Sequence, residues 1–113
     1  MSQKWTDKEH VIRTADIDPG ALGSGSVTIP ASSKGGRPFR VTSIVADASE
    51  CFRLVQGYAG DSRMLEKKDG AVFPVTGLFA TAEPGGVVEI EVKNVSSERR
   101  SFSGKLVGKE LAD

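Results

Sequence analysis

The sequence predicts an all-β fold, an antiparallel β-sandwich of about eight strands in one domain. Between glycines and prolines, apolar residues recur mostly at every second position, which is the period of a half-buried strand. The 13 glycines and 5 prolines leave few stretches long enough for a helix of average length. A chain of 113 residues has room for one hydrophobic core.

The elements follow in chain order. Residues 1–10 are polar and unpatterned, so we expect a flexible N-terminal arm, followed by a single sandwich domain over residues 11–113. Within this domain the spacing predicts strands over residues 11–17, 26–29, 37–46, 51–58, 71–75, 78–81, 88–93 and 101–107. The short polar segments after residues 46 and 94 predict two antiparallel hairpins, one of 37–46 with 51–58 and a central one of 87–95 with 101–107.

Residues 61–70 fit two interpretations. Asp61 is a candidate helix N-cap, lysines come late in the segment, and Gly70 stands where a helix would stop. The segment is either one or two helical turns or a short edge strand.

The clearest strand is Val88–Lys93, in which apolar residues alternate strictly with charged ones. Such a strand has one buried face and one face in water. We therefore expect Ile90 in the core, together with Phe102 from the next strand.

Composition and motifs exclude several classes of function. The 15 basic and 15 acidic residues cancel, which argues against nucleic acid or a membrane as a partner, and no apolar run is long enough to span a bilayer. His10 and Cys51 are the sole histidine and cysteine, and no motif links them, so we expect no enzyme and no zinc site. The glycine-rich segment 20–25 lacks the lysine of a phosphate-binding loop. We expect no cofactor, no metal and no catalytic residue.

Several predicted strands are apolar on both faces, which a lone two-layer sandwich does not need. Ile44 lies opposite the more apolar set of its strand, and Val55 does the same in the following strand. Two interpretations remain open. Either these residues contact another subunit, or β-bulges shift the register and return them to the core. We select Ile44 and Val55 as predicted interface residues.

The chain also resembles a known class of proteins. The segments Gly86–Asn94 and Arg100–Gly108 resemble the closing strands of small jelly-roll virion structural proteins of bacterial viruses, either capsid or capsid-associated. This resemblance implies a jelly-roll-like sandwich that forms homo-oligomers, contacts other virion proteins and performs no catalysis. It also implies a location in the virion, after assembly in the host cytoplasm. Trp5 in the polar arm resembles the anchors by which terminal arms hold a neighbouring subunit, and is the third predicted interface residue.

The alternative function is a β-sandwich module that binds carbohydrate or another ligand. Small sandwiches often present such sites, but sugar binding requires exposed aromatic side chains. Trp5 and Tyr58 are the candidates outside the five phenylalanines.

Overall fold

The computed structural model describes residues 4–64 and 71–112 and confirms the all-β fold class. Its named strands are β1 (Lys4–Ile17), β2 (Leu22–Thr28), β3 (Phe39–Ala46), β4 (Phe52–Ala59), β5 (Ser62–Arg63), β6 (Val75–Ala82), β7 (Val87–Asn94) and β8 (Arg100–Ala112). Two single-turn 3₁₀ helices, η1 (Ser32–Lys34) and η2 (Ser49–Cys51), precede β3 and β4. Residues 65–70 lie outside the described residues. In the described part of the ambiguous segment 61–70, the structure contains the short strand β5.

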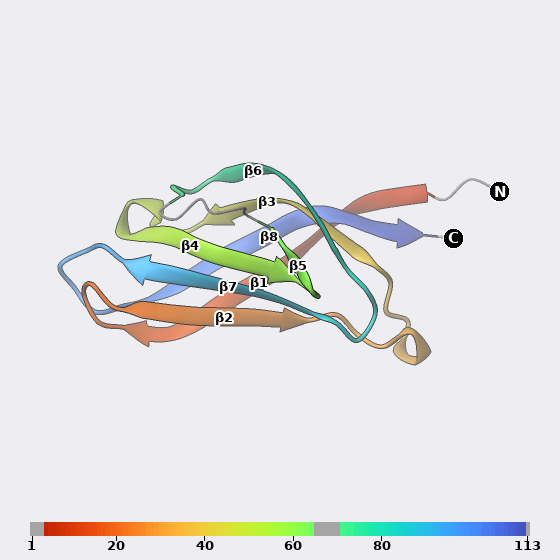
Figure 1. Ribbon diagram of the computed structural model, residues 1–113, viewed down its shortest axis with the longest axis horizontal. Helices are drawn as coiled ribbons and strands as arrows, with labels where there is room; N and C mark the ends of the chain where they lie inside the picture. Colours follow the sequence, from red (N-terminus) through yellow and green to blue (C-terminus); the bar gives the residue numbers. More distant parts are fainter. Residues whose placement is uncertain (1–3, 65–70, 113) are drawn as a thin grey trace.

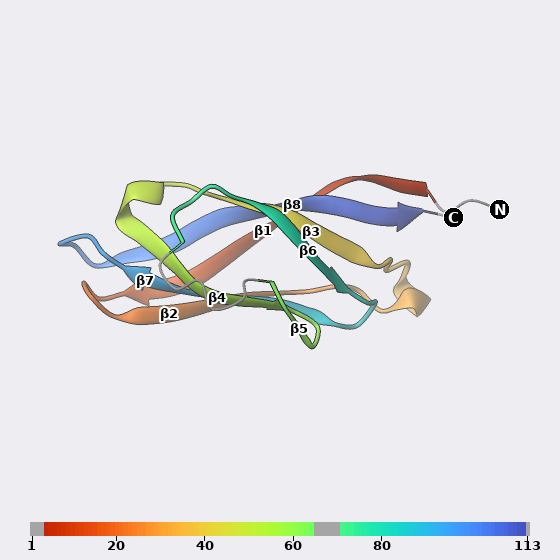
Figure 2. The ribbon, with the colours of Figure 1, turned by 45° about the horizontal axis from the view of Figure 1, so that its top comes forward.

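The strands form an antiparallel sandwich of two four-stranded sheets. Sheet A has the order β1-β8-β3-β6, and sheet B has the order β2-β7-β4-β5. Figure 2 shows β8, β3 and β6 in one layer and β2, β4 and β5 in the other. The pairs β1–β8, β2–β7, β3–β6 and β4–β5 are nested around the middle of the chain, so that strands far apart in sequence lie side by side (Figure 1).

Both predicted hairpins are wrong, although their strands exist. β3 and β4 lie in different sheets, and so do β7 and β8. Period-two alternation specifies which face of a strand is buried, but it does not specify which strand supplies the hydrogen bonds. A connection of a few residues can either pair two strands or cross the roughly 10 Å between two packed sheets. β7 and β8 are nevertheless central, since each is flanked by two strands of its own sheet.

The core lies between the sheets and contains the residues that the alternation assigned to it. Ile90 and Phe102 are fully buried, as predicted. The Phe102 ring packs edge-on against Phe52, with 5.3 Å between centroids, and tilted against Phe73 at 5.2 Å. Cys51 is buried in η2, consistent with a small apolar side chain in the core.

The structure differs from the expectation of a flexible arm over residues 1–10. Residues 4–10 form the first half of β1, and Lys4–Lys8 pair with Gly108–Ala112 of β8. In Figures 1 and 2 this two-stranded ribbon runs past sheet B, at the end of the molecule where both termini lie. Because sheet B does not cover the ribbon, its side chains need no apolar alternation, and the sequence pattern therefore carried no sign of a strand. Residues 1–3 lie outside the described residues.

Asn94, at the end of β7, is a fully buried polar residue. Its side-chain amide donates hydrogen bonds to the carbonyl oxygens of Ile17 (2.8 Å) and Glu98 (2.7 Å). Its side-chain oxygen accepts hydrogen bonds from the amide (2.9 Å) and hydroxyl (2.7 Å) of Ser96. This side chain therefore joins the end of β1 to the turn that carries the chain from sheet B to sheet A.

Candidate interaction surface

The outer face of sheet A begins on β1, where alternate side chains point away from the core. Ile12 is fully buried, whereas its neighbour Val11 is 53% exposed, so the odd-numbered residues from Trp5 to Val11 face outward. The register sets Val11 opposite Lys105 of β8 and Glu9 opposite Val107.

β3 extends this face on the other side of β8. Its pairing places Val45 beside Lys105 and Ser43 beside Val107. Val45 is 45% exposed, and Val107 is half-buried. Val11, Val45 and Val107, from three adjacent strands, form what we call the valine patch. Its members are apolar side chains on the outer face, whereas neighbours such as Ile12 and Ile44 form the core.

The charges around the valine patch fall into two groups. Some are satisfied within the chain, since the Asp7 carboxylate lies 2.5 Å from the Lys109 ammonium group, and the Arg40 guanidinium lies 4.2 Å from the centroid of the Trp5 ring. Glu9 and Lys105 have no ion-pair partner within residues 4–64 and 71–112. Two opposite charges that lack an ion pair within the described residues therefore lie on the same face.

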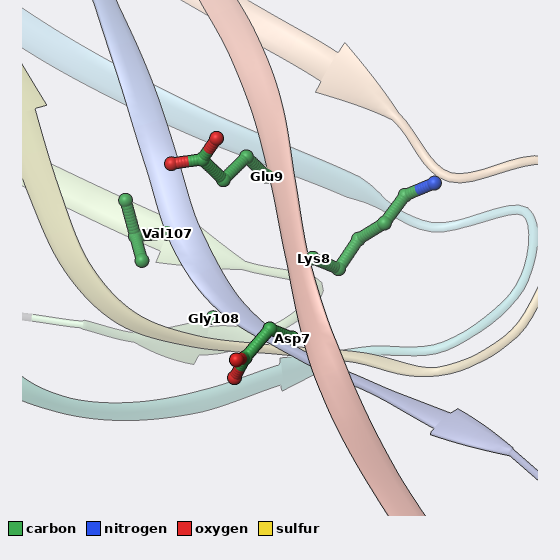
Figure 3. Close-up of a pocket in the computed structure, with 5 residues that line it drawn as sticks. All are labelled: Asp7, Lys8, Glu9, Val107 and Gly108. Carbon is green, nitrogen blue, oxygen red and sulfur yellow. The ribbon is translucent and has the colours of Figure 1, made fainter.

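An open hollow of about 610 Å³ lies beside the patch and is lined by Asp7, Lys8, Glu9, Val107 and Gly108. Figure 3 shows the Asp7 and Glu9 side chains reaching from β1 toward β8, on the same side as Val107, while the Lys8 side chain points the opposite way. Because the lining side chains on this face are two carboxylates and a valine, the hollow suits a basic side chain with an apolar stem.

The structure does not bring the three predicted interface residues together. Trp5 lies on the outer face of sheet A, half-buried against Arg40. Val55 is half-buried on β4 in sheet B, within the bulge between Leu54 and Gln56. Of these two residues, Trp5 lies on the outer face of sheet A described above, and Val55 does not.

The prediction that Ile44 is an interface residue is wrong, because Ile44 is fully buried in the core. A register shift between Val41 and Ser43 turns the strand over, so that Phe39, Val41 and Ile44 all face inward. The same shift places Val45 outside, where strict alternation from Phe39 had assigned it to the core. The interpretation by a β-bulge holds at this site.

Sequence reasoning missed Val11 and Val45 as surface residues. The available signal was their position beside strongly apolar neighbours, such as Ile12 next to Val11 and Ile44 next to Val45. Two adjacent apolar residues in a strand must face opposite ways, so one of them leaves the core.

The outer face of sheet B carries a polar chain of a different kind. The Arg63 guanidinium donates to the Tyr58 hydroxyl (3.0 Å), that hydroxyl donates to the side-chain oxygen of Gln56 (3.3 Å), and the Gln56 amide donates to Glu91 (3.3 Å). The Tyr58 ring is half-buried. This polar chain offers one aromatic surface with several donors and acceptors held around it.

His10, the sole histidine, packs against the core. The His10 ring packs edge-on against Phe39, with 4.6 Å between centroids. Among the residues that the structure describes, no three His, Cys, Asp or Glu side chains gather as metal ligands would. In the same part of the chain, no helix has the length and apolar character needed to cross a bilayer.

No protein-family model, no curated protein and no solved structure matches this chain.

Proposed function

We propose that this protein is a structural, self-assembling β-sandwich that acts through protein–protein contacts, as a capsid or capsid-associated component of a virion. The observation that carries the proposal is the valine patch. Val11 and Val45 remain 53% and 45% exposed, whereas their neighbours Ile12 and Ile44 are fully buried in the core. Apolar side chains gathered on one sheet face gain stability when a partner covers them.

The order of the strands supports the same proposal. Nested pairing of β1–β8, β2–β7, β3–β6 and β4–β5 is what results when one long hairpin rolls into two sheets, as in a jelly roll. The resemblance of the closing strands to virion proteins implies this arrangement. It is also the ground for proposing a location in the virion, after assembly in the host cytoplasm, and contacts with other virion proteins.

The size of the face is sufficient for an interface. A standard protein–protein interface buries about 800 Å² on each partner, which is about an eighth of the 6605 Å² accessible surface of this chain. One face of a four-stranded sheet can supply such an area.

Light scattering of matched variants tests this function. Val45→Asp places a charge in the valine patch, and it should reduce the mass of the assembled species, because burying an unpaired charge is costly. Val95→Asp is the control, since Val95 is 42% exposed in the turn between β7 and β8, away from the patch. The control should assemble as the wild type does. If both variants assembled as the wild type does, the valine patch would not be part of the assembly interface.

A ligand-binding module is the second candidate, favoured by the polar chain on sheet B. An aromatic ring flanked by fixed amide, carboxylate and guanidinium groups is suited to sugar hydroxyls and to the apolar face of a sugar ring. A glycan array should then show binding that Tyr58→Ala abolishes and Val95→Asp leaves intact. Absence of glycan binding by an assembled wild type would favour the structural role alone.

A further inference from the structure

Four residues on the outer face of sheet A form a square with a specific pattern. Glu9 lies opposite Val107 in one row, and Val11 lies opposite Lys105 in the next. The two charged residues therefore occupy one diagonal of the square, and the two valines occupy the other. The charged pair makes no ion-pair contact within the described residues.

This pattern is complementary to a second copy of itself in one arrangement. In a symmetric face-to-face dimer, the two-fold axis lies in the plane of contact. An axis along the strands would set Glu9 against Val107, and an axis across them would set Glu9 against Val11. An axis along the charged diagonal would set Glu9 against Glu9.

The remaining axis, along the Val11–Val107 diagonal, gives favourable contacts throughout. Each valine meets its own copy, and Glu9 meets Lys105 of the second copy twice in every dimer. The axis along the charged diagonal is disfavoured by like charges, and the other two axes leave Glu9 and Lys105 against valines without an opposite charge. Only the valine diagonal pairs opposite charges, which fixes the register.

We propose that this chain pairs with a second copy of itself through the outer face of sheet A, about a two-fold axis along the Val11–Val107 diagonal. Reciprocal Glu9–Lys105 ion pairs set its register. This inference rests on the proposed function, because it names the surface and the geometry of self-assembly.

The hollow beside Glu9 supports the assignment of the partner group. Asp7 is already engaged by Lys109, so Glu9 is the lining carboxylate without an ion pair in the described part of the chain. Lys105 of the second copy would approach over Val107 and place its ammonium group at Glu9, with its stem along the valines. Exclusion of water strengthens the attraction between the two charges, but both also lose hydration, so the pair contributes more to the register of the dimer than to its affinity.

The geometry also fixes how the strands cross. With about 4.8 Å between strands and about 6.8 Å between alternate residues, the diagonal makes an angle of about 35° with the strands. The two copies of sheet A would therefore cross at about 70°, closer to the orthogonal class of sheet packing than to the aligned class.

Charge reversal tests the proposal by sedimentation velocity. Glu9→Lys sets the new lysine against Lys105 of the second copy, and Lys105→Glu sets the new glutamate against Glu9. Each single variant should weaken dimerisation by roughly tenfold or more, and the double variant should return the dissociation constant to within about threefold of wild type. Glu89→Lys makes the same charge change on the outer face of sheet B, and it should leave dimerisation unchanged. Unchanged thermal unfolding of dilute samples confirms that all variants fold.

Each outcome has a distinct meaning. A wild type that assembles while neither single variant weakens the dimer would overturn the inference and leave the proposed function standing. Weakened single variants that the double variant does not rescue would place Glu9 and Lys105 in the interface but contradict their pairing. A wild type that stays monomeric would contradict the proposed function itself.

Discussion

At the scale of single residues, Ile44 and Val45 are sequence neighbours with opposite surroundings. Ile44 has no exposed surface, whereas Val45 is 45% exposed. Strict alternation from Phe39 predicts the reverse, because it does not anticipate the extra residue at the bulge between Val41 and Ser43. A bulge of this kind depends on contacts with β6 and β8, which the local sequence does not encode.

This difference predicts contrasting effects of the same substitution. Ile44→Asp should destabilise the fold by roughly 4 kcal/mol or more, because it buries an unpaired charge in the core. Val45→Asp should cost only about 1 kcal/mol, the range of strand preferences on an open face. Urea unfolding of dilute samples measures both values. Similar losses for the two variants would contradict the register shift.

The environment of His10 predicts a dependence of stability on pH. Burial lowers the pKa of His10 below its usual value of 6.5, and the charge of Lys8 lowers it further, while Glu110 acts in the opposite direction. The unfolded chain then binds the proton more tightly than the folded chain does. The contribution of neutral His10 to the free energy of unfolding is therefore fully present above pH 6.5, and it is lost as the pH falls through the lowered pKa.

The comparison of wild type with His10→Gln isolates this contribution. The free energy of unfolding of the wild type, relative to the variant, should decrease between about pH 7.5 and about pH 5. Denaturant unfolding at several pH values gives this difference. A difference that stays constant, or that grows as the pH falls, would show that burial does not lower the pKa of His10.

At the scale of elements, the sequence predicted where most strands lie and which side chains they bury. Val88–Lys93 and the strand of Phe102 appear as expected, because strict alternation is a local property. The pairing of strands was not predictable in the same way. One of the two partners of β8 is β1, the strand most distant from it in the chain, and the ribbon that they form carries no apolar pattern over residues 4–10.

The turn after β7 illustrates how the chain is directed to the opposite sheet. The side-chain amide group of Asn94 donates hydrogen bonds to Ile17 and Glu98, and its side-chain oxygen accepts hydrogen bonds from Ser96. In the sequence it resembles an ordinary turn residue, and nothing near it shows that Ile17 is its partner. Its buried position indicates that it stabilises the crossover between β7 and β8.

Replacement of Asn94 by aspartate tests this role. Asn94→Asp leaves two carbonyl oxygens facing a group that cannot donate to them, and it should cost about 2–5 kcal/mol at neutral pH. Burial beside these oxygens raises the pKa of the introduced carboxyl group. The variant should therefore be most stable, relative to Asn94→Ala, below the unfolded pKa of about 3.9, and it should lose this advantage as the pH rises. Thermal unfolding of the two variants across this range measures the effect, and equal curves would contradict the hydrogen-bond assignment.

At the scale of the whole molecule, the sandwich has a buried core between its sheets and a partly apolar outer face on sheet A. Of the residues chosen from the sequence, Trp5 lies on that face, Ile44 lies in the core and Val55 lies on sheet B. The apolar residues on the outer face of sheet A are instead Val11, Val45 and Val107. Strand register and the β-bulge decide which residues are exposed, and neither can be read from alternation alone. Self-assembly remains the central proposal.

Native mass spectrometry of the purified wild-type chain tests that proposal most directly. We expect a closed oligomer of defined stoichiometry, built from dimers, whose share of the signal rises with protein concentration. A chain that remains monomeric up to about 0.1 mM would contradict self-assembly, since the dissociation constant would then be too weak for a stable structural contact.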